Sequence, residues 1–510
     1  MLCIAGNDSA GLAGLQADMR TLFAFDIHTA SVVSANTAQN NQQVISINPV
    51  NNLAFKQQLI ALAPFAIDVM KVGLLATAEQ VATVIEHQLS TQLQLVWDPV
   101  LLSSSQKIFS DPILLQAQRQ LIRHCDILTP NRYEAGQLLN TTINSKTDVE
   151  TAAETLLKQG AKAVLITGGV SDGKHCQDYF ADATERFWLS SPGCLTNNTR
   201  GTGCALSTAI AATLALGYSI YDAVTIAKAA INQGLRQSYG LRAKYNHPTQ
   251  TSITKQAPFT AHSLMIEKGT LNISHFPDTQ HDMPTLIQSD DQQQSLVFAK
   301  PCLPNGEALP LGLYPVVANS HWLEQLLLLG ISTIQLRIKN LQGHALEQEV
   351  AKSIAIAKQY NSRLFINDHW QLAIKLNAYG VHLGQEDLAS ANIAAIHAAG
   401  LRLGISTHCH YEVARALSMQ PSYIACGPIY HTTTKIMPWQ PLGIKTLNYW
   451  QKTLDYPLVA IGGINSENII AVAETGVDGI AMISAISNAD DPNQQTLAFL
   501  AAIKAARRQE

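Results

Sequence analysis

Charged residues are scarce in this sequence, and no basic tract gathers those that are present. Lys, Arg, Asp and Glu make up 14% of the 510 residues, and the formal net charge is -4. A protein that binds nucleic acid neutralises the phosphate backbone with clustered Lys and Arg side chains. We therefore expect no nucleic-acid partner.

Long apolar runs are also lacking. The run ALSTAIAATLALG at 205–217 is too short and too rich in hydroxyl side chains to cross a bilayer. The first residues, MLCIAGNDSAG, have neither the basic flank nor the long apolar core of a signal peptide. The sequence therefore predicts a cytoplasmic protein without a membrane partner, and it leaves a homo-oligomer open.

Closely spaced cysteine pairs are absent as well. The eight cysteines are scattered, and no two of them form a C-x-x-C pair. Disulfide frameworks and zinc knuckles depend on regular spacing, so neither is indicated. We expect most of these cysteines to be small buried residues.

What the chain does have is a large apolar fraction, 47%, and a length of 510 residues. This length suits roughly two to four domains. Pro, Gln and Asp gather at 275–309 without sustained periodicity, which is typical of a linker. We predict domains at 1–274 and 310–510, and within the linker LVFAK at 296–300 is a candidate for a short strand.

Short β-rich runs recur after the linker, with helical stretches between them. Apolar strands that alternate with helices form a parallel sheet covered by helices, and eight units in about 200 residues fit a (β/α)8 TIM barrel. A flavodoxin-like sheet needs only about five strands. The eight runs lie at 313–317, 333–337, 363–367, 380–384, 401–406, 423–427, 458–463 and 479–484.

Polar side chains follow several of these runs at the point where each strand ends. Barrel strands are buried along their length and reach solvent at the carboxyl end, where active sites lie. The polar residues at these ends include Arg337, Lys339, Asn367, Asp368 and Asp387. Two carboxylates suit magnesium, and the basic and amide donors suit a diphosphate.

A second anion site is predicted beside the last two runs. Gly462 and Gly463 follow the seventh run, and Ser484 closes the eighth. Barrels commonly bind a phosphate there through backbone N–H groups. The hydroxyl-rich loop GPIYHTTTK at 427–435 lies between the two anion sites in the sequence. Two sites imply two phosphorylated ligands.

These elements closely resemble thiamine phosphate synthase over residues 311–490. QLRIK, FIND, HLGQED, GIS, GPIYHTTTK and IGGI occur in the order of that family. The resemblance implies a Mg²⁺-dependent condensation of hydroxymethylpyrimidine diphosphate with thiazole phosphate, which yields thiamine phosphate and pyrophosphate. A generic phosphate-binding barrel, whose polar rim only keeps it in solution, is the alternative.

By this resemblance the two ligands bind at separate places on the rim. Asp368 and Asp387 would hold magnesium, and His382 is predicted to be an inward strand residue rather than a proton carrier. The pyrimidine diphosphate residues are Gln335, Leu336, Arg337, Ile338, Lys339, Asn367, Ser406 and Lys435. The thiazole phosphate residues are Thr432, Thr433, Thr434, Gly463, Ile483 and Ser484.

The amino-terminal part also alternates between apolar runs and helical stretches, which predicts a doubly wound α/β sheet. The runs lie at 2–5, 30–35, 67–73, 93–98, 125–129 and 162–167.

A Gly201-Thr202-Gly203 turn then opens into an Ala-rich helix, and such a turn predicts an anion site. We place Cys204 as the first residue of this helix, where the helix end would stabilise its thiolate. A thiolate at this position would deprotonate a substrate hydroxyl while the turn holds the transferred phosphoryl group.

Several motifs of this part look like hydroxymethylpyrimidine (phosphate) kinase, of the ribokinase-like group, over residues 1–240. The matching stretches are residues 2–20, AQN, KVG, DPV, TPNRYEA and GTGCALS. The resemblance implies ATP-dependent phosphorylation of the pyrimidine alcohol or its phosphate.

The implied pyrimidine site is Gly6, Ala13, Asp18, Gln39 and Val100. The implied phosphate and nucleotide residues are Asp98, Asn131, Glu134, Gly201, Thr202 and Gly203, with the first three near magnesium. For Asn131 and Glu134, helix capping after Pro130 is the alternative.

This half departs from the family pattern in several places. P-S-G-G-A-G reads SAGLAG, K-N-T-H-G reads NNTRG, the residues after DPV differ, and the usual G-I-G-P ending is absent. Thr167 and Asn197 each remove a cation expected near phosphate, whereas Arg200 restores part of that charge. Two alternatives to an active kinase therefore stand: a pyrimidine-binding module that has lost phosphoryl transfer, and a pyridoxal-type kinase.

Overall fold

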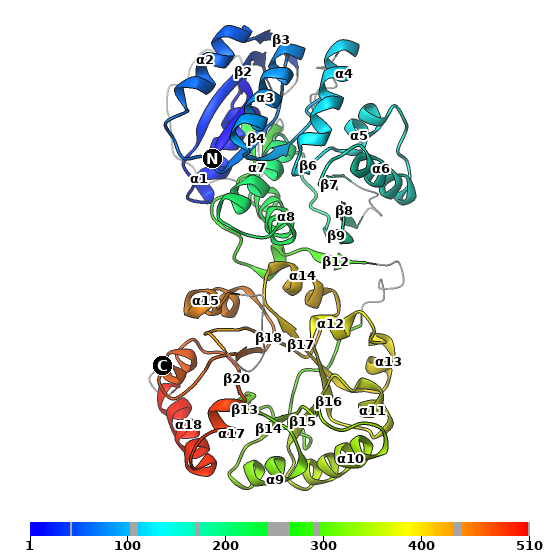
Figure 1. The fold of residues 1–510 in the computed structure, drawn as a ribbon, viewed down its shortest axis with the longest axis vertical. Coiled ribbons are helices and arrows are strands. Elements are labelled where there is room, and N and C mark those ends of the chain that lie inside the picture. Colours follow the sequence, from blue (N-terminus) through cyan, green and yellow to red (C-terminus); the bar gives the residue numbers. More distant parts are fainter. Residues whose placement is uncertain are drawn as a thin grey trace. The chain divides into compact units, whose positions relative to one another are not determined.

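The structure is a computed structural model that describes residues 1–40, 43–101, 111–168, 174–242, 266–288, 296–432 and 440–507. The chain divides into two compact units (Figure 1). Unit 1 comprises Met1–Pro277 and His281–Gln292, and unit 2 comprises Asp278–Gln280 and Gln293–Glu510.

Unit 1 is built on one ten-stranded sheet with the order β12-β9-β8-β7-β6-β5-β4-β1-β2-β3. The strands from β7 to β2 pair in parallel, and the strands outside them pair antiparallel. The bounds are β1 (Leu2–Asp8), β2 (Ala30–Gln39), β3 (Val44–Pro49), β4 (Val69–Val72), β5 (Gln94–Trp97), β6 (Ile127–Leu128), β7 (Ala163–Ile166), β8 (His175–Asp182), β9 (Arg186–Pro192) and β12 (Thr285–Ile287).

The predicted doubly wound sheet is confirmed, and each of the six apolar runs overlaps a strand of its parallel centre. The antiparallel strands were missed. For β3 the reason is that only its first residue is buried, since an exposed edge strand needs no apolar run. This reason does not extend to β8 and β9, which are largely buried. A separate pair joins β10 (Tyr239–Arg242) to β11 (Ile266–Thr270).

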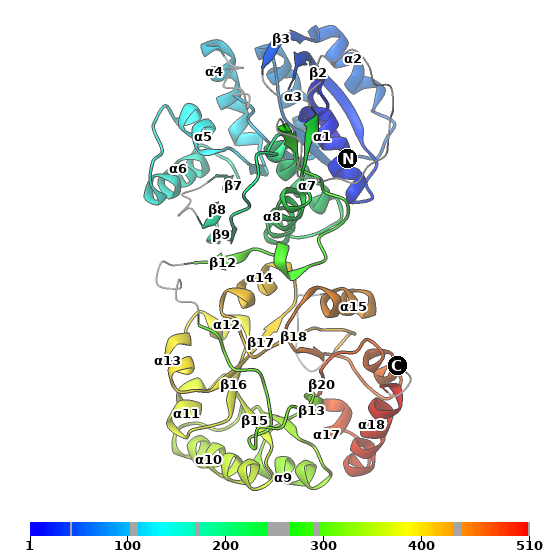
Figure 2. The same cartoon turned by 180° about the vertical axis from the view of Figure 1, so that it is seen from behind.

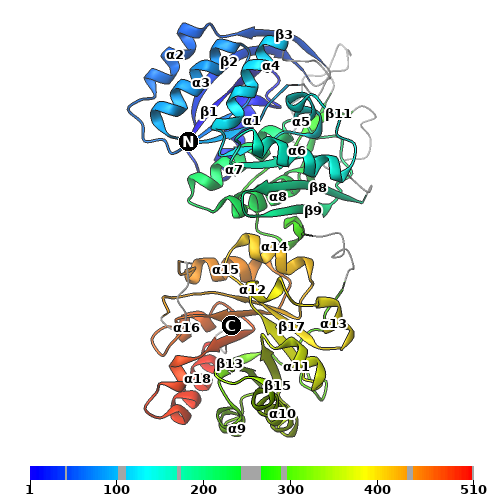
Figure 3. The same ribbon diagram turned by 45° about the vertical axis from the view of Figure 1, so that its right-hand side comes forward.

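Helices pack on this sheet through two sets of contacts. An apolar core joins the strands to side chains of α2 to α6, and α2 packs on β2 and α3 (Figure 3). In the other set, α7 contacts β4, β5, α1 and α8. The bounds are α1 (Gly14–Ala24), α2 (Asn52–Ala61), α3 (Ala78–Thr91), α4 (Pro112–Leu121), η1 (Ile122–His124), α5 (Arg132–Leu139), α6 (Lys146–Lys158), α7 (Thr202–Ala215), α8 (Ile220–Arg236) and η2 (Gln280–Asp282).

Unit 2 is a closed barrel of eight parallel strands, and the first strand pairs with the last. Each strand coincides with one of the eight predicted runs, so the predicted TIM barrel is confirmed. The bounds are β13 (Gly312–Val317), β14 (Thr333–Leu336), β15 (Arg363–Asn367), β16 (Gly380–Leu383), β17 (Arg402–Thr407), β18 (Tyr423–Cys426), β19 (Leu458–Ile461) and β20 (Gly479–Met482).

Helices surround the barrel (Figure 2). Aromatic side chains contribute to its interior. Tyr314, Phe365 and Tyr423 are buried there, and a Cβ atom on Gly404 would lie 2.2 Å from the ring of Tyr423. Glycine at 404 therefore makes room for this core. The helices are α9 (Ser320–Leu328), α10 (Gly343–Gln359), α11 (Trp370–Lys375), α12 (Gln385–Leu388), α13 (Ile393–Ala398), α14 (His410–Ser418), α15 (Gly443–Thr453), α16 (Ile469–Ala473), α17 (Ser484–Ser487) and α18 (Pro492–Ala506).

The segment predicted as a linker contributes to both units. In unit 1, β12 extends the sheet beside β9 and buries Leu286. In unit 2, Phe298 is buried and its N–H donates to the carbonyl of Gln420 at 3.1 Å. The 296–300 run nevertheless forms no strand, so that prediction is wrong. Boundaries at 274 and 310 stay a prediction.

None of the helices in the described ranges combines the length and the hydropathy that crossing a membrane requires.

Candidate active sites

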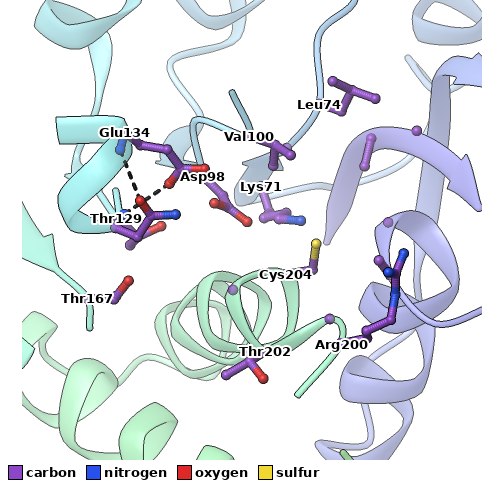
Figure 4. Close-up of a pocket in the computed structure, with 18 of the residues that line it drawn as sticks. Lys71, Leu74, Asp98, Val100, Thr129, Glu134, Thr167, Arg200, Thr202 and Cys204 are labelled. Carbon is purple, nitrogen blue, oxygen red and sulfur yellow. Dashed lines mark hydrogen bonds between the residues drawn. The ribbon is translucent and has the colours of Figure 1, made fainter. Parts of the chain in front are cut away.

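A cavity of about 380 Å³ lies at the carboxyl ends of the parallel strands of unit 1. We call it cavity 1 (Figure 4). It brings together residues that come from opposite ends of the amino-terminal half. The predicted site residues that line it are Gly6, Ala13, Gln39, Asp98, Val100, Asn131, Glu134, Gly201, Thr202, Gly203 and Cys204.

The turn before α7 needs glycine at one position. Gly201 has φ +78°, and a Cβ atom there would lie 2.3 Å from the carbonyl oxygen of Leu12. The helix begins at Thr202, so Cys204 is its third residue and not its first as predicted. The first-turn N–H groups of an α-helix have no partner within the helix, and here that turn borders cavity 1.

The pKa of the Cys204 thiol is raised, whereas the sequence predicted a thiolate stabilised by the helix end. Burial raises its pKa to about 12, and the charge of Lys71 only partly opposes that effect. The carboxylates of Asp98 and Asp18 raise the pKa further. The thiol is therefore protonated at neutral pH, because burial outweighs the helix end.

A fully buried ion pair lies beside cavity 1, and one of its two residues lines the cavity. Lys71 Nζ on β4 is 2.8 Å from Asp18 Oδ1 and 3.0 Å from Asp18 Oδ2 on α1. Neither side chain is exposed, and the Thr208 hydroxyl donates to Asp18 Oδ1 at 2.7 Å.

Asp18, predicted to line the pyrimidine site, is not among the lining residues, because its carboxylate turns toward Lys71. Lys71 does line the cavity and was missed as a site residue. A lysine within the buried strand run IDVMKVG was the signal available.

Two further carboxyl groups border cavity 1. Burial raises the pKa of Asp98 to about 6, with Lys71 opposing the shift and the Ser207 hydroxyl donating to Asp98 at 3.3 Å. Burial and the neighbouring Asp98 charge raise the pKa of Glu134 well above its usual value.

Asn131 and Glu134 make the helix-capping contacts that were the alternative to a role in binding. Asn131 Oδ1 accepts from the Glu134 N–H at 3.0 Å, and Glu134 Oε2 accepts from the Asn131 N–H at 2.9 Å. Both residues cap α5 and also line cavity 1. A nucleotide or magnesium role for them stays a prediction.

Arg200 lines cavity 1 as a nearly buried cation, with 3% of its surface exposed. Burial lowers the pKa of its guanidinium, and the charge of Asp8 raises it. Thr167 also lines the cavity, whereas Asn197 does not. Cavity 1 therefore contains Lys71 and Arg200 as cations.

In unit 2, charged groups meet where β14, β15 and β16 end. Lys339 Nζ lies 2.6 Å from Asp368 Oδ2, and Asp368 has φ +63°. Burial alone would raise the pKa of Asp368, but the hydrogen bond and charge of Lys339 lower it. The pKa of Asp387 is raised by burial and by Asp368, with which it shares a hydrogen bond. The two predicted metal ligands are thus neighbours.

This carboxylate pair fits a divalent cation. Two adjacent carboxyl groups cannot easily both ionise, and a bound cation removes that repulsion. Within the part of the chain that the structure describes, no group of three or more His, Cys, Asp or Glu side chains could hold a metal. The remaining ligands would therefore be water and phosphate oxygens, as magnesium commonly uses.

The other predicted pyrimidine diphosphate residues lie at nearby strand ends. Gln335 and Asn367 are buried polar residues of β14 and β15, and Leu336 and Ile338 are buried. Arg337 directly follows β14, and its N–H donates to the Val317 carbonyl at 2.8 Å. Lys435, Thr433 and Thr434 lie outside the described residues.

His382 is an inward residue of β16, as predicted, and bridges two hydroxyl groups. Its Nε2 lies 2.8 Å from Ser406 Oγ, and its Nδ1 lies 2.7 Å from the Tyr423 hydroxyl. Burial lowers the pKa of His382 to about 4, so the ring is neutral at pH 7. A neutral ring in this position can orient Ser406 but carries no charge.

A second cavity, of about 330 Å³, lies at the ends of β19 and β20. We call it cavity 2. Gly463 has φ +68°, and a Cβ atom on it would lie 2.4 Å from the His431 carbonyl oxygen. The described residues predicted for thiazole phosphate all line it: Thr432, Gly463, Ile483 and Ser484. Binding of that ligand stays a prediction.

Two family models match this chain, one in each half. The model for phosphomethylpyrimidine kinase matches residues 8–250, and the model for thiamine monophosphate synthase matches residues 313–486.

Curated relatives cover the second half. A thiamine-phosphate synthase from Photorhabdus laumondii is 53% identical over 203 residues, which is 39% of this chain and 94% of the relative. One from Proteus mirabilis is 54% identical over 191 residues, or 37% of this chain and 89% of the relative.

Solved structures resemble the first half. A phosphomethylpyrimidine kinase from Clostridium difficile is 32% identical, with 45% of this chain and 96% of that chain covered and a TM-score of 0.41. An ADP complex of Bacillus subtilis pyridoxal kinase is 29% identical, with 47% and 93% covered and a TM-score of 0.45.

Proposed function

Because the chain belongs to the thiamine-phosphate synthase family through its carboxyl-terminal half, we propose that it is a bifunctional transferase of thiamine biosynthesis. Unit 1 is a hydroxymethylpyrimidine (phosphate) kinase, and unit 2 is a thiamine phosphate synthase. The product of the first activity is a substrate of the second, which gives one chain both steps.

The observation that carries the synthase assignment is the meeting of Lys339, Asp368 and Asp387 at one rim of the barrel. In the proposed reaction the thiazole nitrogen bonds to the methylene carbon of the pyrimidine, and the bond from that carbon to the diphosphate oxygen breaks. Lys339 and Arg337 would donate to the departing diphosphate. Mg²⁺, held by the two aspartates, would supply positive charge for the same group.

Cavity 2 supports the choice of thiazole phosphate as the second substrate. Positive φ angles at Gly462 and Gly463 let the backbone approach closely, and backbone N–H groups in such turns bind phosphate. His382, neutral and bonded to Ser406, would orient that hydroxyl toward the aminopyrimidine. No side-chain nucleophile is required.

In unit 1 the acceptor hydroxyl would attack the γ-phosphorus of ATP, and the bond from that phosphorus to ADP would break. The first turn of α7 would hold the transferred group. Cys204, whose thiol is protonated in this structure, would take the hydroxyl proton only in its thiolate form, which the charge of Lys71 favours. Arg200 supports this assignment because it contributes a positive charge to cavity 1. Thr167 and Asn197, which stand where the family has cations, contribute none.

Small molecules are the substrates, namely the pyrimidine, ATP and thiazole phosphate, and we infer Mg²⁺ for both units. A cytoplasmic location, without nucleic acid or membrane, suits these ligands and the formal net charge of -4.

The test supplies the full-length chain with pyrimidine alcohol, ATP, Mg²⁺ and thiazole phosphate, and follows each intermediate by mass spectrometry. Monophosphate, diphosphate and then thiamine phosphate are expected in turn. If thiamine phosphate forms only when pyrimidine diphosphate is added, the proposed kinase activity is wrong. Faster phosphorylation of pyridoxal in a parallel reaction would reject the pyrimidine as its preferred acceptor.

A further inference from the structure

The ion pair of Lys71 and Asp18 has no evident purpose in the fold. Both side chains are fully buried, and Lys71 sits in a strand whose four residues are all buried. Burying a charged pair is costly, and apolar residues of similar volume often stabilise a core as well or better. A buried cation kept beside a cavity therefore suggests a role in that cavity.

Lys71 lies at the border of the cavity. Lys71 lines cavity 1 together with Gly73, Asp98 and Cys204. A Cβ atom on Gly73 would lie only 3.1 Å from Lys71 Nζ, so the glycine leaves space beside the ammonium. Figure 4 shows Lys71, Asp98 and Cys204 grouped at the centre of this cavity.

Asp18 keeps the cation charged and in place. It accepts from Lys71 through both carboxylate oxygens and from the Thr208 hydroxyl of α7. Burial alone would lower the pKa of Lys71, but the charges of Asp18, Cys204 and Asp98 together outweigh it, with Asp18 the largest of them, and the pKa is raised. Three elements, α1, β4 and α7, thus hold one fixed positive charge.

We propose that Lys71 is a positioning residue for phosphoryl transfer, whose charge, fixed by Asp18, stabilises the Cys204 thiolate that accepts the proton of the acceptor hydroxyl. The inference rests on the kinase activity proposed for unit 1. The proton passes from the hydroxyl to sulfur as the oxygen bonds to the γ-phosphorus and ADP leaves. Lys71 keeps its own proton throughout.

The surrounding charges agree with this role. The groups that act on the Cys204 thiol are Lys71, Asp98 and Asp18, and among them only Lys71 favours the thiolate. The Gly14 N–H, which donates to the thiol, is a weaker influence in the same direction. Lys71 is therefore the group that most opposes the rise in the pKa of Cys204 caused by burial.

The test replaces the ion pair by a neutral pair that keeps its hydrogen bonds, Lys71→Gln with Asp18→Asn. The first readout is alkylation of Cys204 by iodoacetamide at pH 8.5, measured by peptide mass spectrometry. The rate at Cys204 is expected to fall about threefold or more, because losing the charge of Lys71 outweighs losing the weaker, opposing charge of Asp18. The exposed cysteines Cys176 and Cys194 are internal references and should react at the wild-type rate.

A matched control removes another nearly buried lysine pair of this unit, Lys228 with Asp178, whose side chains are 7% and 8% exposed. Lys228→Gln with Asp178→Asn should leave the alkylation rate of Cys204 within about twofold, since neither residue lines cavity 1. Thermal unfolding checks that both double variants are folded. If the first is not, Lys71→Met with Asp18→Leu replaces it.

The second readout separates positioning from binding. For the neutral pair, kcat of phosphorylation should fall about threefold or more, in step with the loss of thiolate, while KM for the pyrimidine alcohol stays within about twofold. Unchanged Cys204 alkylation in a folded variant overturns the inference, as does a loss confined to KM. A wild-type chain without kinase activity overturns the proposed function instead, and the alkylation readout still decides the role of Lys71.

Discussion

The two units handle buried charge in different ways. In unit 1 the central cation, Lys71, has no exposed side-chain surface and is neutralised by Asp18. In unit 2 the corresponding pair is open, since the side chains of Lys339 and Asp368 are 57% and 21% exposed. The charges of unit 1 are therefore fixed before any ligand binds, whereas those of unit 2 can rearrange around one.

The chemistry proposed for each unit matches this difference. Phosphoryl transfer depends on charge that is already oriented when the reacting groups arrive. Departure of a diphosphate needs cationic groups that can follow the leaving oxygen atoms, and exposed lysine and magnesium can do so. We expect variants in unit 1 to affect proton transfer, and variants in unit 2 to affect how well the negative charge of the bound diphosphate is stabilised.

The largest effect is expected from Cys204→Ala. Phosphorylation should fall by about 10²- to 10⁴-fold, because the proton acceptor is lost. Condensation of added pyrimidine diphosphate should keep its rate, since Cys204 belongs to unit 1. Cys176→Ala, at an exposed cysteine of the same unit, is the control. An unchanged phosphorylation rate in the Cys204 variant would show that Cys204 is not the proton acceptor.

Asp368→Asn should lower the rate of thiamine phosphate formation by about 10²- to 10³-fold and weaken its dependence on magnesium. Asp387 alone would then face the cation. Glu347→Gln removes a surface carboxylate paired with Lys375 in the same unit and should have little effect. Rates measured across a magnesium titration decide the matter, and an identical metal dependence would contradict the site.

Gly463→Ala tests cavity 2. A Cβ atom there would approach the His431 carbonyl to 2.4 Å, so the turn must shift. We expect KM for thiazole phosphate to rise about tenfold, with a smaller change for the pyrimidine diphosphate. Gly476→Ala is a matched control, because Gly476 has φ +76° but nothing within 4 Å of its Cβ position. Equal effects of the two variants would mean that backbone strain alone matters.

The smallest effect concerns stability at low pH. Folding lowers the pKa of His382 from 6.5 to about 4, so the unfolded chain binds the proton more readily. The resulting stability is present above pH 6.5 and is lost as the pH falls through 4, to a total of about 3 kcal/mol. Urea unfolding of unit 2 in magnesium-free buffer should show this loss, and His382→Gln should reduce it. An equal pH slope in the variant would assign the loss to other groups.

The barrel was more predictable from sequence than the first sheet. Every barrel strand lies between two others and is buried on both faces, so each appears as an apolar run. Among the antiparallel strands of unit 1, the edge strand β3 gave no apolar run because it is largely exposed, whereas β8 and β9 are largely buried and were missed all the same. Polar residues at strand ends, such as Asn367 and Asp368, were found because the ends of parallel strands share one rim.

What the sequence by itself determined is the succession of the barrel strands and of the parallel strands of unit 1, the residue types at their ends and the turn at Gly201 to Gly203. These depend on local pattern and on spacing along the chain. Only the tertiary structure decided that Asp18 faces Lys71 across 53 positions of sequence and that burial keeps the Cys204 thiol protonated. Burial and the distances between charges set those properties, and both arise only when distant segments pack together.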